Sequence, residues 1–261
     1  MNIIRTWASA FLSALLLLSA SAVISAQEPK YKADVPSSIL TPDKVETRLG
    51  TLRFNDGAPD ARTVELVYDN LDFIRGVEAF LDGIPAASIY GICRGYREAG
   101  VGPQSVGIFE NLMDARSIFL TANSTTVYVS KCYELENGPI VIEMPPGMLG
   151  PMDDAYFRHI ADFGVTGADK GKGGRYLFVP PGYKGELPKE GYLVYHSPTY
   201  TTMMLVRAFV GEEGIEATVK QVKDTLRVYP YAQRNNPPAT DFVNLSGLKI
   251  NTVHANDFTL F

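Results

Sequence analysis

The sequence predicts an α+β fold, with a mainly antiparallel β-sandwich or jelly-roll-like core that is preceded and followed by amphipathic helices. Beyond Gly100, short runs rich in Ile, Val, Tyr, Phe and Thr alternate with Gly, Pro and Asn, which is typical of strands joined by turns. Before and after these runs, apolar residues recur at three- and four-residue steps, as on one face of a helix. An alternating β/α fold would instead place a helix between successive strands.

Three helices are expected. Asp60 stands at the N-cap position of the first one. The Gly-Ile-Pro sequence at residues 83–85 predicts a break, so that a second helix runs from Ala86 to about Arg97. The third follows the strands. The apolar face of the first helix comprises Val64, Val67, Leu71, Ile74, Val77 and Leu81, and that of the third comprises Ile215, Val219, Val222 and Leu226.

The expected strands lie in short segments bounded by turn residues. These segments are SIFLTA, STTVYVSKCYEL, PIVIEMPP, AYFRHIADFGV, RYLFVPP, GYLVYHSP and TTMMLVRAFV, and VETRLGTLRF adds an edge strand. The glycine-rich segment GVTGADKGKGGRY at residues 164–176 lacks the G-x-x-x-x-G-K-[ST] pattern of a phosphate-binding loop, and a strand-like run follows it. We therefore expect a wide connection between two strands with solvated lysines.

The first 26 residues are typical of a secretory signal peptide. Arg5 precedes an apolar run at residues 8–18, and small residues lead to a cleavage site near Ala26. The run is shorter than the roughly 20 residues that cross a bilayer, so no transmembrane segment is expected in the mature chain. This predicts an exported protein, periplasmic or extracellular. We expect an extended lead-in at residues 27–59, a helical hairpin plus β-rich core domain at 60–230, and an irregular segment at 231–261 that leads to a missing C-terminal domain.

Charge and cysteine content narrow the function classes. The formal net charge of −5 argues against a nucleic-acid-binding protein, which usually presents a basic face. An exported protein can form disulfides, and the chain contains Cys93 and Cys132. Two interpretations stay open at this point: a disulfide bond, or two buried thiols that pack as small apolar groups.

Three long segments resemble the bacterial exported family of domain of unknown function 1254. They are GIFENLMDARSIFLTANSTTVYV, GPIVIEMPPGMLGPMDDAYFRHIADFGVTGADKGKGGRYLFVPPGYKG and VNLSGLKINTVHANDFTLF, and the likeness runs from about Lys44 to Phe261. Members are typically β-rich and are followed by a second domain, catalogued as 1214. The resemblance therefore implies that Phe261 is a truncation point and that the missing C-terminal domain is a partner. It implies no particular reaction.

Many members of that family carry an Asn followed by Asp-Thr-(Leu/Val)-Tyr at the start of a strand. Residues 123–128 resemble this run, with Thr125 where an aspartate is common. The departure argues against catalysis at this point. The candidate ligand-binding residues are Asn123, Thr126, Tyr128, Arg175 and Tyr176.

The densest polar cluster is MDDAYFRHIADFG at residues 152–164. If it is one strand, Asp153 and His159 share a face but lie about 20 Å apart, too far to bind one metal without Asp162 or His196 from a neighbour. The alternative is structural, with the aspartates in a turn and an arginine paired across the sheet. The candidate catalytic residues are Asp154, Arg158, His159 and His196.

The histidine and cysteine spacing matches no metal-binding motif, so neither a metal site nor a cofactor is expected. Two functions remain. One is a ligand-binding or assembly module of a larger two-domain protein, with a small-molecule or carbohydrate ligand and with homo-oligomer formation as an option. The other is an exported hydrolase or metal-assisted enzyme with a polar site on the β core.

Overall fold

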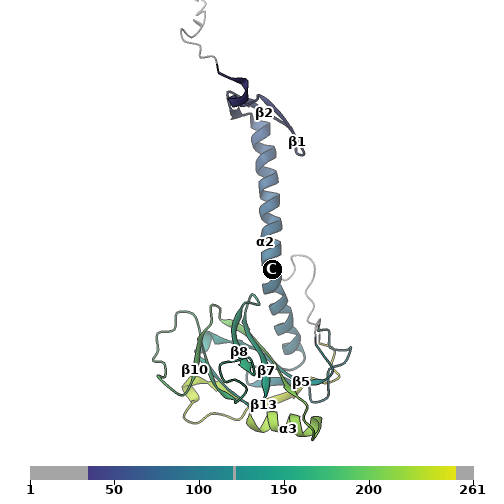
Figure 1. Ribbon diagram of the computed structural model, residues 1–261, viewed down its shortest axis with the longest axis vertical. Helices are drawn as coiled ribbons and strands as arrows, with labels where there is room; N and C mark the ends of the chain where they lie inside the picture. Colours follow the sequence, from purple (N-terminus) through teal and green to yellow (C-terminus); the bar gives the residue numbers. More distant parts are fainter. Residues whose placement is uncertain (1–34, 120–121, 251–261) are drawn as a thin grey trace, which may run out of the picture. The chain divides into compact units, whose positions relative to one another are not determined.

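The computed structural model describes residues 35–119 and 122–250 (Figure 1). The expected signal peptide and the last eleven residues, 251–261, lie outside this part. The chain divides into two compact units, Met1–Leu71 and Asp72–Phe261. Within the described residues, every helix is too short or too polar to cross a membrane.

The first unit contains a small antiparallel sheet. Its strands are β1 (Lys44–Thr47), β2 (Gly50–Asn55) and β3 (Ala58–Pro59), in that order, after the short 3-10 helix η1 (Ser37–Ile39). The expected edge strand is therefore a β1–β2 hairpin. The backbone N–H of Arg53 on β2 donates to the hydroxyl of Thr63 at 2.8 Å, which joins the sheet to the start of the following helix.

One helix, α2 (Ala61–Glu98), replaces the two that the sequence predicts. Asp60 is its cap as expected, since its Oδ1 accepts a hydrogen bond from the Thr63 N–H at 2.7 Å. The predicted break at residues 83–85, and with it the helical hairpin, was wrong, because Pro85 lies inside the helix. Proline removes one backbone hydrogen bond. The helix continues because Ile89, Cys93 and others beyond it are buried in the second unit.

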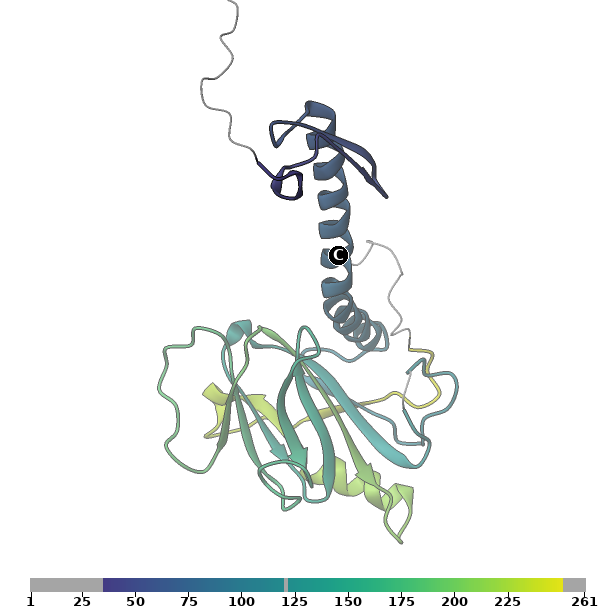
Figure 2. The ribbon, with the colours of Figure 1, turned by 45° about the horizontal axis from the view of Figure 1, so that its top comes forward.

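The second unit holds two mostly antiparallel sheets and one further helix (Figure 2). The six-stranded sheet has the order β13-β4-β5-β11-β7-β8, and the four-stranded sheet has the order β10-β9-β6-β12. The pairs β13–β4 and β10–β9 are parallel. The strands and helices are β4 (Ser105–Ile108), β5 (Thr126–Glu134), η2 (Leu135–Asn137), β6 (Ile140–Met144), β7 (Met148–Asp154), β8 (His159–Gly164), β9 (Gly174–Val179), β10 (Leu193–His196), β11 (Thr201–Phe209), α3 (Ile215–Thr225), β12 (Arg227–Pro230), η3 (Tyr231–Gln233) and β13 (Asp241–Asn244).

The α+β class is confirmed. Two helices and three mostly antiparallel sheets are present in the described residues, and none of these sheets closes into a barrel. The sandwich or jelly-roll arrangement is not confirmed. On β5, side chains alternate between two sides as expected: Val127 and Val129 pack in the main core, whereas Tyr128 between them packs in a second cluster. The main core also takes Val219 and Val222 from α3.

Two predicted strands differ from the structure. The segment SIFLTA contains no strand in its described residues, 117–119 and 122. The segment at residues 152–164 is not one strand but a hairpin, in which β7 ends at Asp154 and β8 starts at His159. The turn between them is possible because Phe157 adopts a positive φ of 58°. Strand β7 was not predicted from the sequence because Gly150 and Pro151 interrupt its run of apolar residues.

The glycine-rich segment connects β8 to β9 and so links the six-stranded sheet to the four-stranded one. Strand β9, and not a helix, follows the segment directly, which confirms a connection between strands. Lys170 and Lys172 are exposed. Asp169 holds the connection: its carboxylate accepts hydrogen bonds from the Tyr176 hydroxyl at 2.8 Å and from the Gly173 N–H at 2.9 Å. At Gly173, φ is +79° and a Cβ would lie 2.7 Å from the Met144 carbonyl oxygen. Glycine is therefore needed for close backbone approach.

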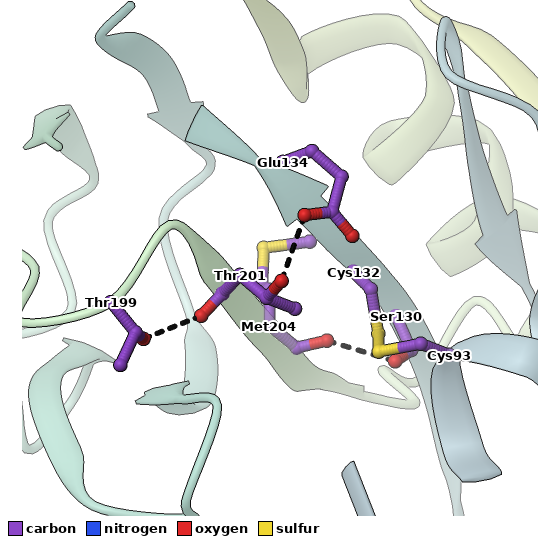
Figure 3. The surroundings of a disulfide bond; sticks show 7 residues. All are labelled: Cys93, Ser130, Cys132, Glu134, Thr199, Thr201 and Met204. Atoms are coloured by element: carbon purple, nitrogen blue, oxygen red, sulfur yellow. Dashed lines mark hydrogen bonds between the residues drawn. A yellow bond between two sulfur atoms is a disulfide. The ribbon is translucent and has the colours of Figure 1, made fainter. Parts of the chain in front are cut away.

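The two cysteines form a disulfide, with an Sγ–Sγ distance of 2.02 Å (Figure 3). The bond joins the last turns of α2 to β5, near the hydrogen bond from the Ser130 hydroxyl to the Met204 carbonyl (2.8 Å) between β5 and β11. Of the two interpretations that the sequence leaves open, the disulfide is the correct one.

Candidate functional site

A cavity of about 530 Å³ lies in the second unit. The last turns of α2, the segment that follows them, β5, η2, the start of β6 and β12 all contribute to its wall. Its lining residues are Cys93, Tyr96, Arg97, Gly100, Val101, Gly102, Pro103, Gln104, Val106, Lys131, Cys132, Tyr133, Glu134, Asn137, Gly138, Ile140, Val228, Tyr229 and Pro230.

The lining divides by exposure. Its buried side chains are mostly apolar or aromatic, including Val101, Val106 and Tyr133. Apart from Pro103, its exposed side chains are polar: Arg97 and Gln104 on one segment of the chain, Glu134 and Asn137 on another. An apolar interior with a few polar groups at its opening is the usual composition of a small-molecule site.

Lys131 is the buried charge of this cavity. The residue is 5% exposed, and its Nζ donates to the carbonyl oxygens of Gly102, Pro103 and Ser105 at 2.7, 2.9 and 2.6 Å. It also lies 5.6 Å from the centre of the Tyr133 ring. No carboxylate among the described residues forms an ion pair with it, and burial lowers the pKa of its ammonium to about 8.

These three hydrogen bonds have a structural consequence. They fix the segment 102–105, which forms one wall of the cavity, against β5. The disulfide fixes a second wall, because Cys93 on α2 and Cys132 on β5 both line the cavity. The cavity is thus held by cross-links between distant segments.

In the predicted ligand-binding run at residues 123–128, the polar groups form hydrogen bonds with one another. The side-chain oxygen of Asn123 accepts the backbone N–H groups of Thr125 (3.0 Å) and Thr126 (3.1 Å), and its amide donates to the Tyr128 hydroxyl at 3.1 Å. The Thr125 hydroxyl also donates to this oxygen, at 3.0 Å, a bond that an ionised aspartate at this position cannot make. The run therefore shapes the turn that leads into β5.

Asp154 organises the β7–β8 turn. Its side chain is 0% exposed, and its two oxygens accept the backbone N–H groups of Tyr156 (2.7 Å) and Arg158 (2.9 Å) and the Arg158 Nε–H (2.7 Å). The Arg158 guanidinium lies 5.4 Å from the centre of the Tyr156 ring. Each of these hydrogen bonds to the Asp154 carboxylate thus comes from its own hairpin. This agrees with the alternative that the cluster has a structural role.

Asp153 and His159 are directly opposite each other across the β7–β8 pair. The expected separation of about 20 Å was wrong, because it assumed one continuous strand. His159 Nε2 lies 3.4 Å from Asp162 Oδ1. Burial raises the pKa of Asp153; His159 opposes this shift, and Asp154 and Asp162 add to it. Among the described residues, no group of three or more His, Cys, Asp or Glu side chains is arranged to hold a metal ion.

The remaining candidates lie elsewhere. Arg175 is exposed, with its guanidinium 4.9 Å from the centre of the Tyr192 ring. Tyr176 is fully buried and bonded to Asp169, and His196 is exposed at the end of β10.

The sequence-predicted residues do not converge. On β11, the partner of Tyr128 is Arg207 and the partner of Asp154 is Thr202. Five residues of strand separate these two levels, which corresponds to about 17 Å. No predicted catalytic or ligand-binding residue lines the cavity.

Lys131 and Arg97 line the cavity but are not among the residues predicted from the sequence. One signal was present: Lys131 is the single charged residue within the run VYVSKCY, where alternation predicts burial of every second side chain. The other lining residues lie in separate segments between Cys93 and Pro230, and no sequence pattern indicates that these segments are close in space.

The second unit is therefore an α+β domain with a cavity whose walls are cross-linked by the disulfide and by Lys131. The family model described as Protein of unknown function (DUF1254) matches residues 104–230, and the chain thus contains a DUF1254 domain at these residues. Among solved structures, the crystal structure of the VPA0106 protein from Vibrio parahaemolyticus is similar at 16% identity and a TM-score of 0.43. The match covers 62% of this chain and 41% of that one, so the chain spans about two fifths of the length of that protein. The comparison with curated proteins found no match.

Proposed function

We propose that the DUF1254 domain of this chain is a ligand-binding module and that its ligand occupies the 530 Å³ cavity. The observation that carries this proposal is the cavity itself, whose volume lies within the range of about 300–1,000 Å³ that is usual for small-molecule sites. Its mostly apolar buried lining favours a small molecule with an apolar body over a carbohydrate, the other ligand class named from the sequence.

The walls support binding by a preformed site. Lys131 and the disulfide hold two walls in place without a ligand. A site that is already ordered loses little conformational entropy when it binds, so more of the contact energy appears as affinity. We also interpret the two sheets as a β-sandwich, because their side chains share one core cluster. The disulfide supports export to an oxidising compartment, periplasmic or extracellular.

Narrowing the cavity at its rim tests the proposal. We expect the neutral fluorescent probe N-phenyl-1-naphthylamine to bind the purified protein saturably, and Asn137→Trp to weaken this binding at least about tenfold, since a bulky ring enters the opening. A tenfold change corresponds to about 1.4 kcal/mol. Glu136→Trp is the matched control, because Glu136 is exposed in the same η2 turn but does not line the cavity. Fluorescence titration gives the affinities. Equal affinities for the two variants would contradict the proposal.

The alternative is a hydrolase with a polar site on the β7–β8 hairpin. Its support is the juxtaposition of Asp153, His159 and Asp162, which the hairpin brings together. Asp154 and Arg158 are committed to the turn.

Two alanine variants separate the structural role from the catalytic one. We expect Asp154→Ala to lower the free energy of unfolding by about 3 kcal/mol, because it removes the buried carboxylate that accepts three hydrogen bonds and holds the turn. The His159 side chain is 58% exposed, so His159→Ala should change the free energy of unfolding by less than about 0.5 kcal/mol. Urea denaturation gives both values. Under our proposal, neither variant removes turnover of p-nitrophenyl esters beyond the loss of folded protein. Measurable wild-type turnover that disappears in stable His159→Ala would favour the hydrolase.

A further inference from the structure

The charge of Lys131 is unusual for its place. Buried ammonium groups are generally paired with a carboxylate, because removal from water is costly. Here three carbonyl dipoles take the place of that partner. The positive charge therefore stays uncompensated beside an apolar cavity, where the low dielectric strengthens its attraction for an anion.

The charged side chains of the lining sum to one net positive charge. Of its residues, Arg97 and Lys131 are basic and Glu134 is acidic. The Arg97 guanidinium forms no ion pair within the described residues, and it lies 5.8 Å from the centre of the Tyr90 ring. The Glu134 carboxylate accepts a hydrogen bond from the Thr201 hydroxyl at 2.8 Å.

We propose that the cavity takes an organic anion, with an apolar body in the buried part and a carboxylate or sulfonate group that is attracted by Lys131 and Arg97. This rests on the proposed function and specifies its ligand class. The anion does not have to displace a carbonyl from Lys131, since attraction between unit charges acts over several ångströms in a low dielectric. Arg97 lies at the rim and meets the part of the ligand nearest to water.

The proposal sets a direction for the pH dependence of binding. The groups that face Lys131 are three backbone carbonyls and the Tyr133 ring, and the other titratable side chains of the lining are Arg97, Glu134, Tyr96 and Tyr229. Because burial lowers the pKa of Lys131 to about 8, raising the pH through this value removes its positive charge. Affinity for an anion should fall over this interval, and affinity for a neutral ligand should not.

A matched pair of probes tests the charge preference. 1-Anilinonaphthalene-8-sulfonate has the aromatic body of N-phenyl-1-naphthylamine plus one sulfonate. We expect the wild-type protein to bind the sulfonate about tenfold more tightly at pH 7, and this ratio to fall toward one at pH 9.5. Asn137→Trp should weaken both probes, which assigns the binding to the cavity. Equal affinities at pH 7 would overturn the anion proposal and leave the ligand-binding proposal standing. Failure of both probes to bind would overturn both.

Charge variants locate the effect. Lys131→Met should remove most of the preference for the sulfonate while it retains binding of the neutral probe. Since this variant leaves three carbonyls without a donor and its folding is at risk, Arg97→Gln is the second variant, with an expected threefold loss of sulfonate affinity. Arg94→Gln is its control, because Arg94 is exposed and paired with Glu98 but does not line the cavity. Equal sulfonate affinities in Arg97→Gln and Arg94→Gln, with no pH dependence in the wild type, would overturn the proposal.

Discussion

Replacing Gly164 by alanine is expected to prevent the β core from folding. Gly164 is the last residue of β8 and has a φ of +73°, and a Cβ there would lie 1.6 Å from the carbonyl oxygen of Met148. That oxygen belongs to β7 and accepts the Val165 N–H at 3.1 Å. The obstacle is backbone, so it can move only if the β7–β8 pairing opens.

Gly182→Ala is the matched control for this substitution. Gly182 has a similar φ of +69°, but a Cβ there would meet no heavy atom within 4 Å. We expect a loss of about 1–2 kcal/mol, the cost of the left-handed conformation for a residue with a Cβ. Far-ultraviolet circular dichroism and urea denaturation should show an unfolded Gly164→Ala and a folded Gly182→Ala. Similar stability of the two variants would show that the close approach at Gly164 has no role.

The part of the fold that follows from local periodicity was predictable. The apolar face of α3 and the alternation along β5 are properties of neighbouring residues, and both elements form where the sequence places them. The errors arose where tertiary packing outweighs a local signal. Pro85 would end an isolated helix, but burial of the residues beyond it keeps α2 continuous. The positive φ of Phe157, which allows the β7–β8 turn, has no reliable sequence signal.

The candidate site was less predictable than the fold. Polar residues that are dense in the sequence, at 123–128 and 152–164, turn out to bond mainly to their own turns. Side chains such as those of Asn and Asp often bond to nearby backbone, so local density of polar groups is weak evidence for a site. The cavity instead combines Arg97, Lys131 and Val228, which are far apart in the sequence and come from α2, the six-stranded sheet and the four-stranded sheet.

Loss of the disulfide is expected to be the second large effect. The bond between Cys93 and Cys132 closes a loop with a sequence separation of 39. The chain-entropy relation gives a stabilisation of about 4 kcal/mol for a loop of this size. We therefore expect Cys93→Ser combined with Cys132→Ser to lower the free energy of unfolding by up to this amount. Under reducing conditions, the wild-type protein should unfold at the same urea concentration as the double variant, since both then lack the cross-link.

The same double variant also links stability to binding. Because both cysteines line the cavity, the wall between α2 and β5 loses its covalent cross-link in this variant. A less ordered site pays more conformational entropy on binding, so the neutral probe should bind more weakly even where the double variant is fully folded. Unchanged affinity in the folded double variant would mean that Lys131 and the core packing hold the cavity without the bond, and that the disulfide serves stability alone.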